Sequence, residues 1–194
     1  MIQPNIPRRS MQKQIIETFL TFLMEKGWNH TTLEDVANTL NVSIGEIQNI
    51  LPQKEKIFHL LASEVESSVY SELQDPDIVV YAEKDQVMEI LVTKLEAMTP
   101  FKVFLKYLRN NFLSHTEISI PFAMAELASL EKILAHYQIN QNNLLGELKR
   151  KAIFGVYLLA MDTWVQDESP DLAPTLAKLD RLLSKGETFL ERYS

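Results

Sequence analysis

The sequence predicts an all-α protein, and three observations support that prediction. Glycine is rare, with five in 194 residues. Apolar residues recur at intervals of three and four along every long segment, which is the spacing of one face of an α-helix. The alternation of apolar and polar residues that marks a half-buried strand is scarce. We therefore expect about nine helices and no sheet.

The chain is long enough to bury a substantial core. Hydrophobic residues make up 46% of it and charged residues 23%, which is typical of globular domains. Its length of 194 residues fits a small module fused to a larger helical bundle. We expect the module at residues 1–55 and the bundle at residues 56–194.

Composition also excludes several classes of protein. Cysteine is absent, which removes disulfides, thiolate metal sites and cysteine nucleophiles and favours a reducing cytoplasm. We find no signal peptide and no apolar run near the roughly 18 residues of a membrane span. Four scattered histidines (His30, His59, His115 and His136) lack the pairing of a metal site. Without a phosphate loop, nucleophile elbow or paired acids, we expect no enzyme, cofactor or metal.

The net charge of −7 is unevenly distributed. Residues 1–60 are neutral, because their cations are Arg8, Arg9, Lys13, Lys26, Lys54 and Lys56 and their acids are Glu17, Glu25, Glu34, Asp35, Glu46 and Glu55. All of the excess negative charge lies downstream. A neutral N-terminal segment can contact DNA phosphates while the acidic remainder of the chain is kept away from them. The charge distribution is thus compatible with DNA binding but does not by itself indicate it.

The first helix is expected over residues 10–27, where glycine ends it. Two overlapping capping boxes follow, Thr31 with Glu34 and Thr32 with Asp35. A short second helix should therefore begin directly after the two threonines.

The turn after the second helix has the features of a helix-turn-helix. Asn41 tolerates the left-handed conformation that ends a helix, and Ser43 with Glu46 forms a capping box that opens a third helix over residues 44–51. Ala37 lies four residues before Asn41 and is small enough for two helices to cross closely. This unit is either a DNA-binding module or only a folded cap on the bundle.

Six further helices are expected, separated by breaks at proline or asparagine. A long fourth helix should follow Pro52 and reach about residue 73. The others are expected at about residues 84–98, 101–114, 121–137, 141–167 and 173–192.

The N-terminal motifs resemble, in order and spacing, the signature of the tetracycline-repressor-like (TetR-like) regulators. The matching residues are Gly27 and residues 31–37, 42–45 and 52–55. The resemblance implies a homodimeric transcriptional regulator that binds a double-stranded DNA operator and responds to an apolar small molecule. In that fold a long fourth helix joins a three-helix helix-turn-helix domain to a helical bundle.

The resemblance also implies roles for individual residues. Thr32 would be the N-cap that meets a phosphate, residues 43–49 the recognition helix, and Lys54 the phosphate contact at the start of the fourth helix. The residues expected to contact DNA are Arg8, Arg9, Thr32, Ser43, Ile44, Gly45, Gln48, Asn49 and Lys54.

The expected recognition helix departs from the family at Gln48 and Ile50, where tyrosine and an aromatic residue or histidine are usual. It also carries Glu46 and no cation. The amides of Gln48 and Asn49 can still hydrogen-bond adenine edges or phosphates, because each presents a donor and an acceptor together.

A second resemblance lies near the C-terminus. A set of residues there resembles the C-terminal part of the accessory proteins of ubiquinone biosynthesis. The matching residues are Lys149, Arg150, Phe154, Tyr157, residues 161–171, Thr175 and residues 179–181. Those proteins bind lipid and keep a TetR-like fold without acting as repressors. This resemblance implies an alternative, in which the chain is a lipid-binding accessory protein that has lost DNA binding and meets a membrane surface.

Aromatic residues at helical spacing in the second half of the chain have two interpretations. They line a pocket for an apolar small molecule or lipid, or they are core. The pocket candidates are Phe104, Tyr107, Phe154, Tyr157 and Trp164.

The last helix carries leucines down one side, at Leu172, Leu176, Leu179, Leu183 and Leu190. This stripe has three interpretations: it forms a dimer interface, it binds a membrane surface, or it packs within the protomer. We favour dimerisation, because acidic residues dilute the positive face that anionic lipid would attract.

Overall fold

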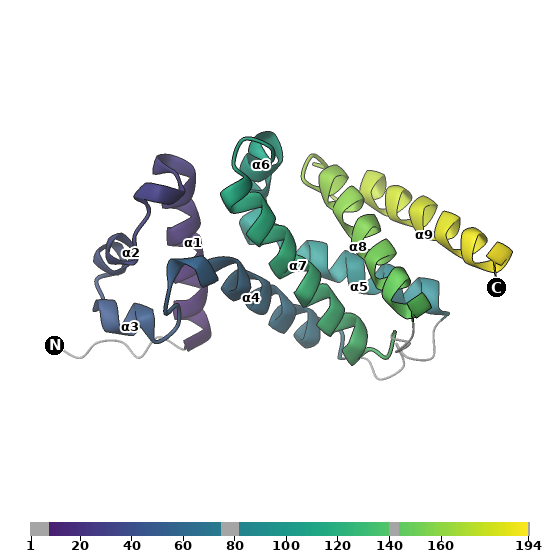
Figure 1. Cartoon of the computed structure of the whole chain (residues 1–194), viewed down its shortest axis with the longest axis horizontal. Coiled ribbons are helices and arrows are strands. Elements are labelled where there is room, and N and C mark those ends of the chain that lie inside the picture. The colour runs from purple at the N-terminus through teal and green to yellow at the C-terminus, as the bar shows by residue number, and fades with distance from the viewer. Residues whose placement is uncertain (1–7, 75–81, 140–143, 194) are drawn as a thin grey trace. The chain divides into compact units, whose positions relative to one another are not determined.

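The computed structural model describes residues 8–74, 82–139 and 144–193, and this part of the chain contains nine α-helices and no strand (Figure 1). The predicted all-α class is therefore confirmed. None of the described helices is long and apolar enough to cross a membrane.

The helices are α1 (Arg8–Lys26), α2 (Leu33–Leu40), α3 (Ile44–Gln48), α4 (Ile57–Glu72), α5 (Glu83–Ala97), α6 (Lys102–Asn111), α7 (Thr116–His136), α8 (Leu144–Trp164) and α9 (Ala173–Tyr193). Short 3₁₀ turns precede three of them: η1 (Trp28–His30) before α2, η2 (Lys54–Lys56) before α4 and η4 (Thr99–Phe101) before α6.

The chain forms two compact units. The helix-turn-helix unit consists of Met1–Glu64 and Val103–Glu126, and the C-terminal unit consists of Val65–Lys102 and Leu127–Ser194. Helices α4 and α7 contribute residues to both units. The predicted boundary at residue 55 separates functional parts of the chain and stays a prediction. The compact units, which are defined by packing, divide in the middle of α4.

The core of the helix-turn-helix unit follows from the apolar spacing of α1. Ile15, Ile16, Phe19 and Leu23 are fully buried, as expected for residues on one face of a helix. The Phe19 ring meets Trp28 edge to face, with ring centroids 6.1 Å apart. This contact joins α1 to the aromatic cluster of the unit, which consists of Trp28, Phe58, Phe104 and Phe122.

The core of the C-terminal unit is built mainly by α5, α7 and α8, and α9 lies side by side with α8 (Figure 1). Tyr157 and Trp164 of α8 are among its largest fully buried side chains. The Lys102 ammonium lies 4.7 Å from the centre of the Trp164 ring and donates a hydrogen bond of 2.7 Å to the carbonyl oxygen of Asp167. These contacts secure the end of α8.

A buried aspartate organises the connection from α8 to α9. Asp167 Oδ1 accepts hydrogen bonds from the Ser169 amide at 3.0 Å and hydroxyl at 2.5 Å. Its Oδ2 accepts from the Thr175 amide at 3.1 Å and hydroxyl at 2.6 Å. The hydroxyls of Ser169 and Thr175 are the largest causes that lower the pKa of Asp167, to about 2. The side chain therefore stays ionised and satisfies four donors near the start of α9.

This network predicts a loss of stability in acid. The folded pKa of Asp167 is about 2, below the ordinary 3.8, so its contribution is complete above the ordinary value and declines as pH falls toward 2. We expect Asp167→Asn to lower the melting temperature at neutral pH by about 5 °C and to flatten the acid decline. Thermal melts followed by circular dichroism across this range measure both effects. The exposed Asp162→Asn is the control, and equal melting curves for the two variants would contradict the prediction.

Several helix boundaries differ from the prediction by two residues or more, and two of them are informative. The expected break at Pro121 was wrong, because α7 begins at Thr116 and continues through the proline. The Ser119 hydroxyl donates to the Phe112 carbonyl oxygen at 2.8 Å and holds the true turn between α6 and α7. The third helix ends at Gln48 instead of residue 51, and Pro52 excludes Leu51 from it because the residue before a proline is restricted to extended conformations.

Candidate nucleic-acid interface

The turn between α2 and α3 has the predicted geometry. Asn41 adopts φ 53° and ψ 42°, the left-handed conformation, and is the C-cap of α2. Its amide donates to the Asn38 carbonyl oxygen at 3.3 Å, and the Val42 amide donates to the Ala37 carbonyl oxygen at 3.1 Å. Ala37 is 4% exposed, so its small side chain is buried where the two helices meet. The turn directs α3 away from the axis of α2.

The N-terminus of α2 is capped by its own acid. Thr32 Oγ1 accepts from the Asp35 amide at 3.2 Å and donates to Asp35 Oδ2 at 2.7 Å, and the Thr32 amide donates to the same oxygen at 3.2 Å. Lys26 Nζ lies 2.5 Å from that oxygen. The hydrogen bond from Lys26 is the largest cause that lowers the pKa of Asp35 to about 2. The Asp35 carboxylate thus accepts hydrogen bonds from the amide and hydroxyl of Thr32, the residue that the resemblance expects to meet a phosphate.

Of the two capping boxes predicted for α2, that of Thr32 with Asp35 is present. The expected role of Thr31 as a second cap was wrong. Thr31 is fully buried and donates its hydroxyl to the Gly27 carbonyl oxygen at 2.9 Å. This contact joins the segment before α2 to the residue that follows α1.

The N-terminus of α3 repeats this arrangement. Glu46 Oε2 accepts from the Ser43 amide at 2.8 Å and hydroxyl at 2.7 Å, and the Glu46 amide donates to Ser43 Oγ at 3.3 Å. The Ser43 amide, and then its hydroxyl, lower the pKa of Glu46 below its ordinary range. An ionised carboxylate therefore lies at the positive end of the helix dipole.

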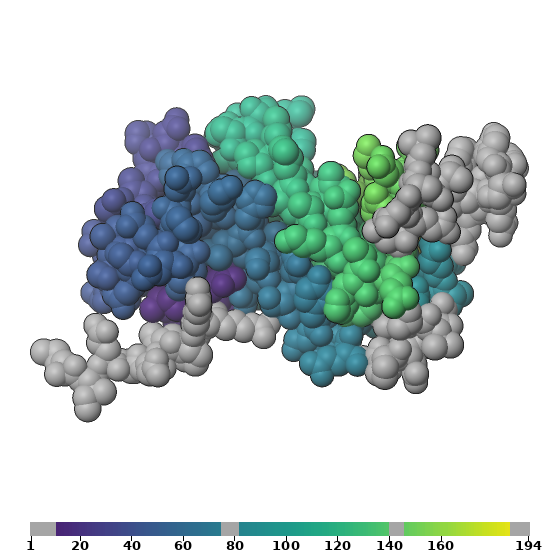
Figure 2. All heavy atoms as spheres, turned by 60° about the horizontal axis from the view of Figure 1, so that its bottom comes forward, coloured from purple at the N-terminus to yellow at the C-terminus, as the bar shows by residue number. Residues whose placement is uncertain are grey.

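One buried residue anchors α3, and its other faces point outward. Ile47 is fully buried, whereas Gly45, Gln48 and Asn49 are exposed and Ile44 is half-buried. In the space-filling view the blue atoms around α3 form an open surface of this unit (Figure 2). The structure therefore brings the expected recognition residues together on one accessible face.

Lys54 lies half-buried in η2 and makes contacts within the unit. Its ammonium donates to the carbonyl oxygens of Trp28 at 2.9 Å and Thr31 at 3.3 Å and lies 5.0 Å from the centre of the Trp28 ring. Two of its three donors thus join the start of α4 to the segment before α2. The expected phosphate contact of Lys54 stays a prediction. Arg8 and Arg9 begin α1, and their side chains lie outside the described residues.

The pocket candidates are divided between the two units. Phe104 is 1% exposed and packs with Phe58 and Phe122 in the aromatic cluster, and the Tyr107 ring stacks on His115. The remaining candidates lie in the C-terminal unit, where the rings of Phe154 and Tyr157 are 6.4 Å apart and Trp164 packs under Lys102. Their role as a pocket stays a prediction.

A buried lysine in the C-terminal unit was not predicted from the sequence. Lys94 of α5 is fully buried, donates to Ser129 Oγ at 3.2 Å and lies 5.4 Å from the centre of the Tyr157 ring. A signal for it existed, because Lys94 continues the apolar spacing of Val87, Ile90 and Leu91 along α5. A cation at a core position of a helix indicates polar contacts within the bundle.

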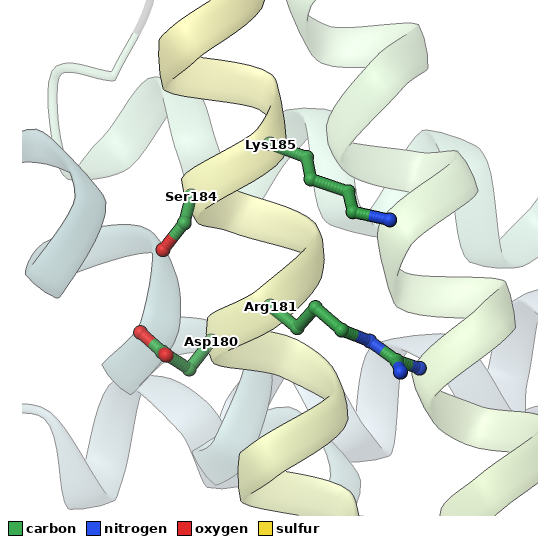
Figure 3. Close-up of a pocket in the computed structure, with 4 residues that line it drawn as sticks. All are labelled: Asp180, Arg181, Ser184 and Lys185. Atoms are coloured by element: carbon green, nitrogen blue, oxygen red, sulfur yellow. The ribbon is translucent and has the colours of Figure 1, made fainter.

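A depression of about 460 Å³ lies along α9 and is lined by Asp180, Arg181, Ser184 and Lys185 (Figure 3). Lys84 donates to Asp180 Oδ1 at 2.7 Å and to Ser184 Oγ at 2.8 Å, which fixes α9 against α5. Each of the four lining side chains ends in a charged group or a hydroxyl. Among the residues that the structure describes, no three metal-binding side chains gather into a cluster.

Comparison with known proteins found no matching family model and no matching curated protein. Solved structures are similar over nearly the whole chain. A TetR transcriptional regulator from Nitrosomonas europaea has a TM-score of 0.65 and 19% identity, covering 90% of this chain and 97% of its own. A TetR-family regulator from Shewanella sp. PV-4 has a TM-score of 0.57 and 18% identity, covering 89% and 95%. One from Mesorhizobium loti has a TM-score of 0.52 and 13% identity, covering 93% and 96%. The chain therefore has the fold of the TetR-family transcriptional regulators.

Proposed function

We propose that this chain is a cytoplasmic, TetR-like transcriptional regulator that binds double-stranded operator DNA as a homodimer and responds to an apolar small molecule. The arrangement of α2, turn and α3 carries the proposal. The left-handed Asn41 and the buried Ile47 hold a capped α3 with Gln48 and Asn49 exposed. A short helix held in this way is suited to lie in the major groove.

Binding to DNA tests the proposal directly. Fluorescence anisotropy would compare the region upstream of the protein's own gene with shuffled DNA of equal length at moderate salt. We expect at least about a thousandfold tighter binding to the specific region. Equal affinity for both DNAs would contradict the proposal.

The charge of Glu46 should oppose this binding. Glu46→Gln keeps a side chain that can complete the capping box but removes a negative charge from the exposed end of α3. We expect the variant to bind operator DNA about fivefold more tightly at low salt, since two unit charges 4 Å apart in water interact by about 1 kcal/mol. Anisotropy titrations at two salt concentrations measure the change, which should shrink at high salt.

Glu25→Gln is the matched control for this prediction. Glu25 is exposed on α1 of the same unit, and its substitution changes the net charge by the same amount. A gain that is equal in both variants would show that total charge, and not the position of Glu46, governs the effect.

Dimerisation is supported by an apolar stripe on α8. Leu148 and Leu159 are 57% and 52% exposed, and their spacing of eleven residues places them on one helix face. Ala152 and Gly155 lie between them, and a Cβ added at Gly155 would meet nothing within 4 Å. An exposed stripe of this kind suits a self-complementary helix pair.

Substitution within this stripe should separate the protomers. We expect Leu159→Glu to give a monomer at micromolar concentration, because a dimer would bury the introduced carboxylate without a partner. Size-exclusion chromatography with light scattering measures the mass. Leu113→Glu is the control, as Leu113 is 87% exposed in the other unit. A dimer that persists in Leu159→Glu would place the interface elsewhere.

The proposed effector site lies in the C-terminal unit. The chain has two tryptophans, and in Trp28→Phe only the fully buried Trp164 remains to report on that unit. Saturable quenching of Trp164 by an apolar molecule that also releases DNA would support the proposal. Release of DNA without any change at Trp164 would place the effector elsewhere.

The lipid-binding accessory protein is the second candidate, and one observation bears on the loss of DNA binding that it requires. Acids cap both α2 and α3, and α3 carries no cation. A module with these features is a weak electrostatic partner for DNA. Native mass spectrometry that finds a co-purified lipid, together with flotation on liposomes, would support this candidate. Absence of both would exclude it.

A further inference from the structure

The exposed face of α3 carries an unusually restricted set of chemical groups. Ile44 and Gln48 lie one helical turn apart, and Gly45 and Asn49 lie beside them in the same relation. These four residues, which we name the reading face, offer one apolar side chain, two amides and one bare stretch of backbone. A Cβ built at Gly45 would contact only Ser43 Oγ, at 3.9 Å, so the surface is open at that point.

The reading face has no group suited to guanine. Guanine is read in the major groove mainly by arginine or lysine, which donate to its O6 and N7 atoms. Residues 43–51 contain neither. The nearby cations Lys26 and Lys54 are engaged within the unit, by Asp35 and by the carbonyl oxygens of Trp28 and Thr31.

The acid of α3 is also poorly placed to read cytosine. A carboxylate reads cytosine by accepting from its N4 amino group. The Glu46 carboxylate instead turns back toward the N-terminus of the helix, where Oε2 accepts from the Ser43 amide and hydroxyl at 2.8 and 2.7 Å. Reading cytosine would require breaking the cap that starts α3.

Adenine and thymine match the groups that remain. Glutamine and asparagine amides accept from the adenine N6 amino group while donating to N7, and apolar side chains contact the thymine methyl group. Gln48 and Asn49 are exposed and supply these amides, and Ile44 supplies the apolar contact. Gly45 allows the backbone to approach the base edges closely.

We propose that α3 selects A·T base pairs at the centre of each half-site, with Gln48 and Asn49 reading adenine and Ile44 contacting thymine. This inference rests on the proposed function as a DNA-binding regulator. It adds the class of base that the site recognises and assigns the recognition to the reading face.

Selection from a random duplex library with the full-length protein tests the inference. We expect enriched sequences with A·T pairs at the half-site centres. Replacing those adenines with 7-deazaadenine, which lacks the N7 acceptor, should weaken binding by about tenfold for the wild type and by less for Gln48→Ala, which keeps only the Asn49 contact to N7. Gln53→Ala is the control, because Gln53 is an exposed glutamine outside α3 and should respond like the wild type.

The outcomes separate the inference from the function on which it rests. Enrichment of G·C pairs at the half-site centres, or weakening by 7-deazaguanine in place of 7-deazaadenine, would overturn the inference and leave DNA binding intact. A library without any enriched sequence would overturn the proposed function and the inference together. An equal response to 7-deazaadenine in the wild type and Gln48→Ala would overturn the assignment to Gln48.

Discussion

Replacing Phe58 with alanine is expected to lower the free energy of unfolding by about 3–5 kcal/mol, as for other buried aromatic residues. Phe58 is 1% exposed and lies at the centre of the aromatic cluster. Its ring stacks on those of Trp28 at 6.0 Å and Phe104 at 6.1 Å, and meets Phe122 edge to face at 6.0 Å. The substitution removes all three contacts and leaves a cavity between α4 and the helices packed on it within this unit.

Urea unfolding followed by circular dichroism and by tryptophan fluorescence measures this loss. Trp28 contacts Phe58 directly, so its emission should shift before the urea midpoint of the wild type is reached. Phe112→Ala is the control, because Phe112 is 48% exposed in the same unit and should change stability by less than about 0.5 kcal/mol. Similar losses in the two variants would show that the cluster is not a core.

Replacing Trp164 with alanine should have an effect of the same size in the C-terminal unit, about 3–5 kcal/mol. Trp164 is 1% exposed near the end of α8, and the Lys102 ammonium lies over its ring. Loss of the ring removes that cation–π contact and leaves Lys102 beside an empty space. Because Lys102 also donates to the Asp167 carbonyl oxygen, the connection to α9 should loosen as well.

Thermal and urea unfolding again measure the change, with Lys151→Ala as the control on the same helix. Lys151 is exposed and is not one of the stripe residues, so truncating it removes little buried surface. Trp164→Phe distinguishes the loss of the aromatic ring from the loss of side-chain volume. It keeps a ring beneath Lys102 and should therefore be more stable than Trp164→Ala. A stable Trp164→Ala protein that binds an apolar molecule more tightly would instead favour the pocket interpretation of this residue.

The helix-turn-helix could be predicted from sequence because its signals are local. The capping boxes of Thr32 with Asp35 and of Ser43 with Glu46 join residues three apart, and the Asn41 turn depends on the conformation of one residue. Such interactions need no other part of the chain to form. The structure has each of them where the sequence predicts it.

Predictions that depended on the surroundings of a residue were less successful. Thr31 and Thr32 both have an acid three residues later, yet Thr31 is buried and bonds to Gly27. Pro121 reads as a break, yet it lies within α7. Lys94 drew no prediction at all, yet it is fully buried. In each case burial or a contact outside the helix itself decided the outcome, and neither capping nor proline rules take these into account.

The sequence by itself therefore determined the helical class, the number of helices and the capped turn that presents α3, because propensity, spacing and capping act within one or two turns of a helix. Only the tertiary structure decided what two lysines of the module do. Lys26 pairs with Asp35, and Lys54 donates to the carbonyl oxygens of Trp28 and Thr31, because folding brings donors and acceptors from separate segments within hydrogen-bond distance. What remains exposed on α3 is a pair of amides, an isoleucine and a glycine, and these groups define the DNA that the protein is expected to read.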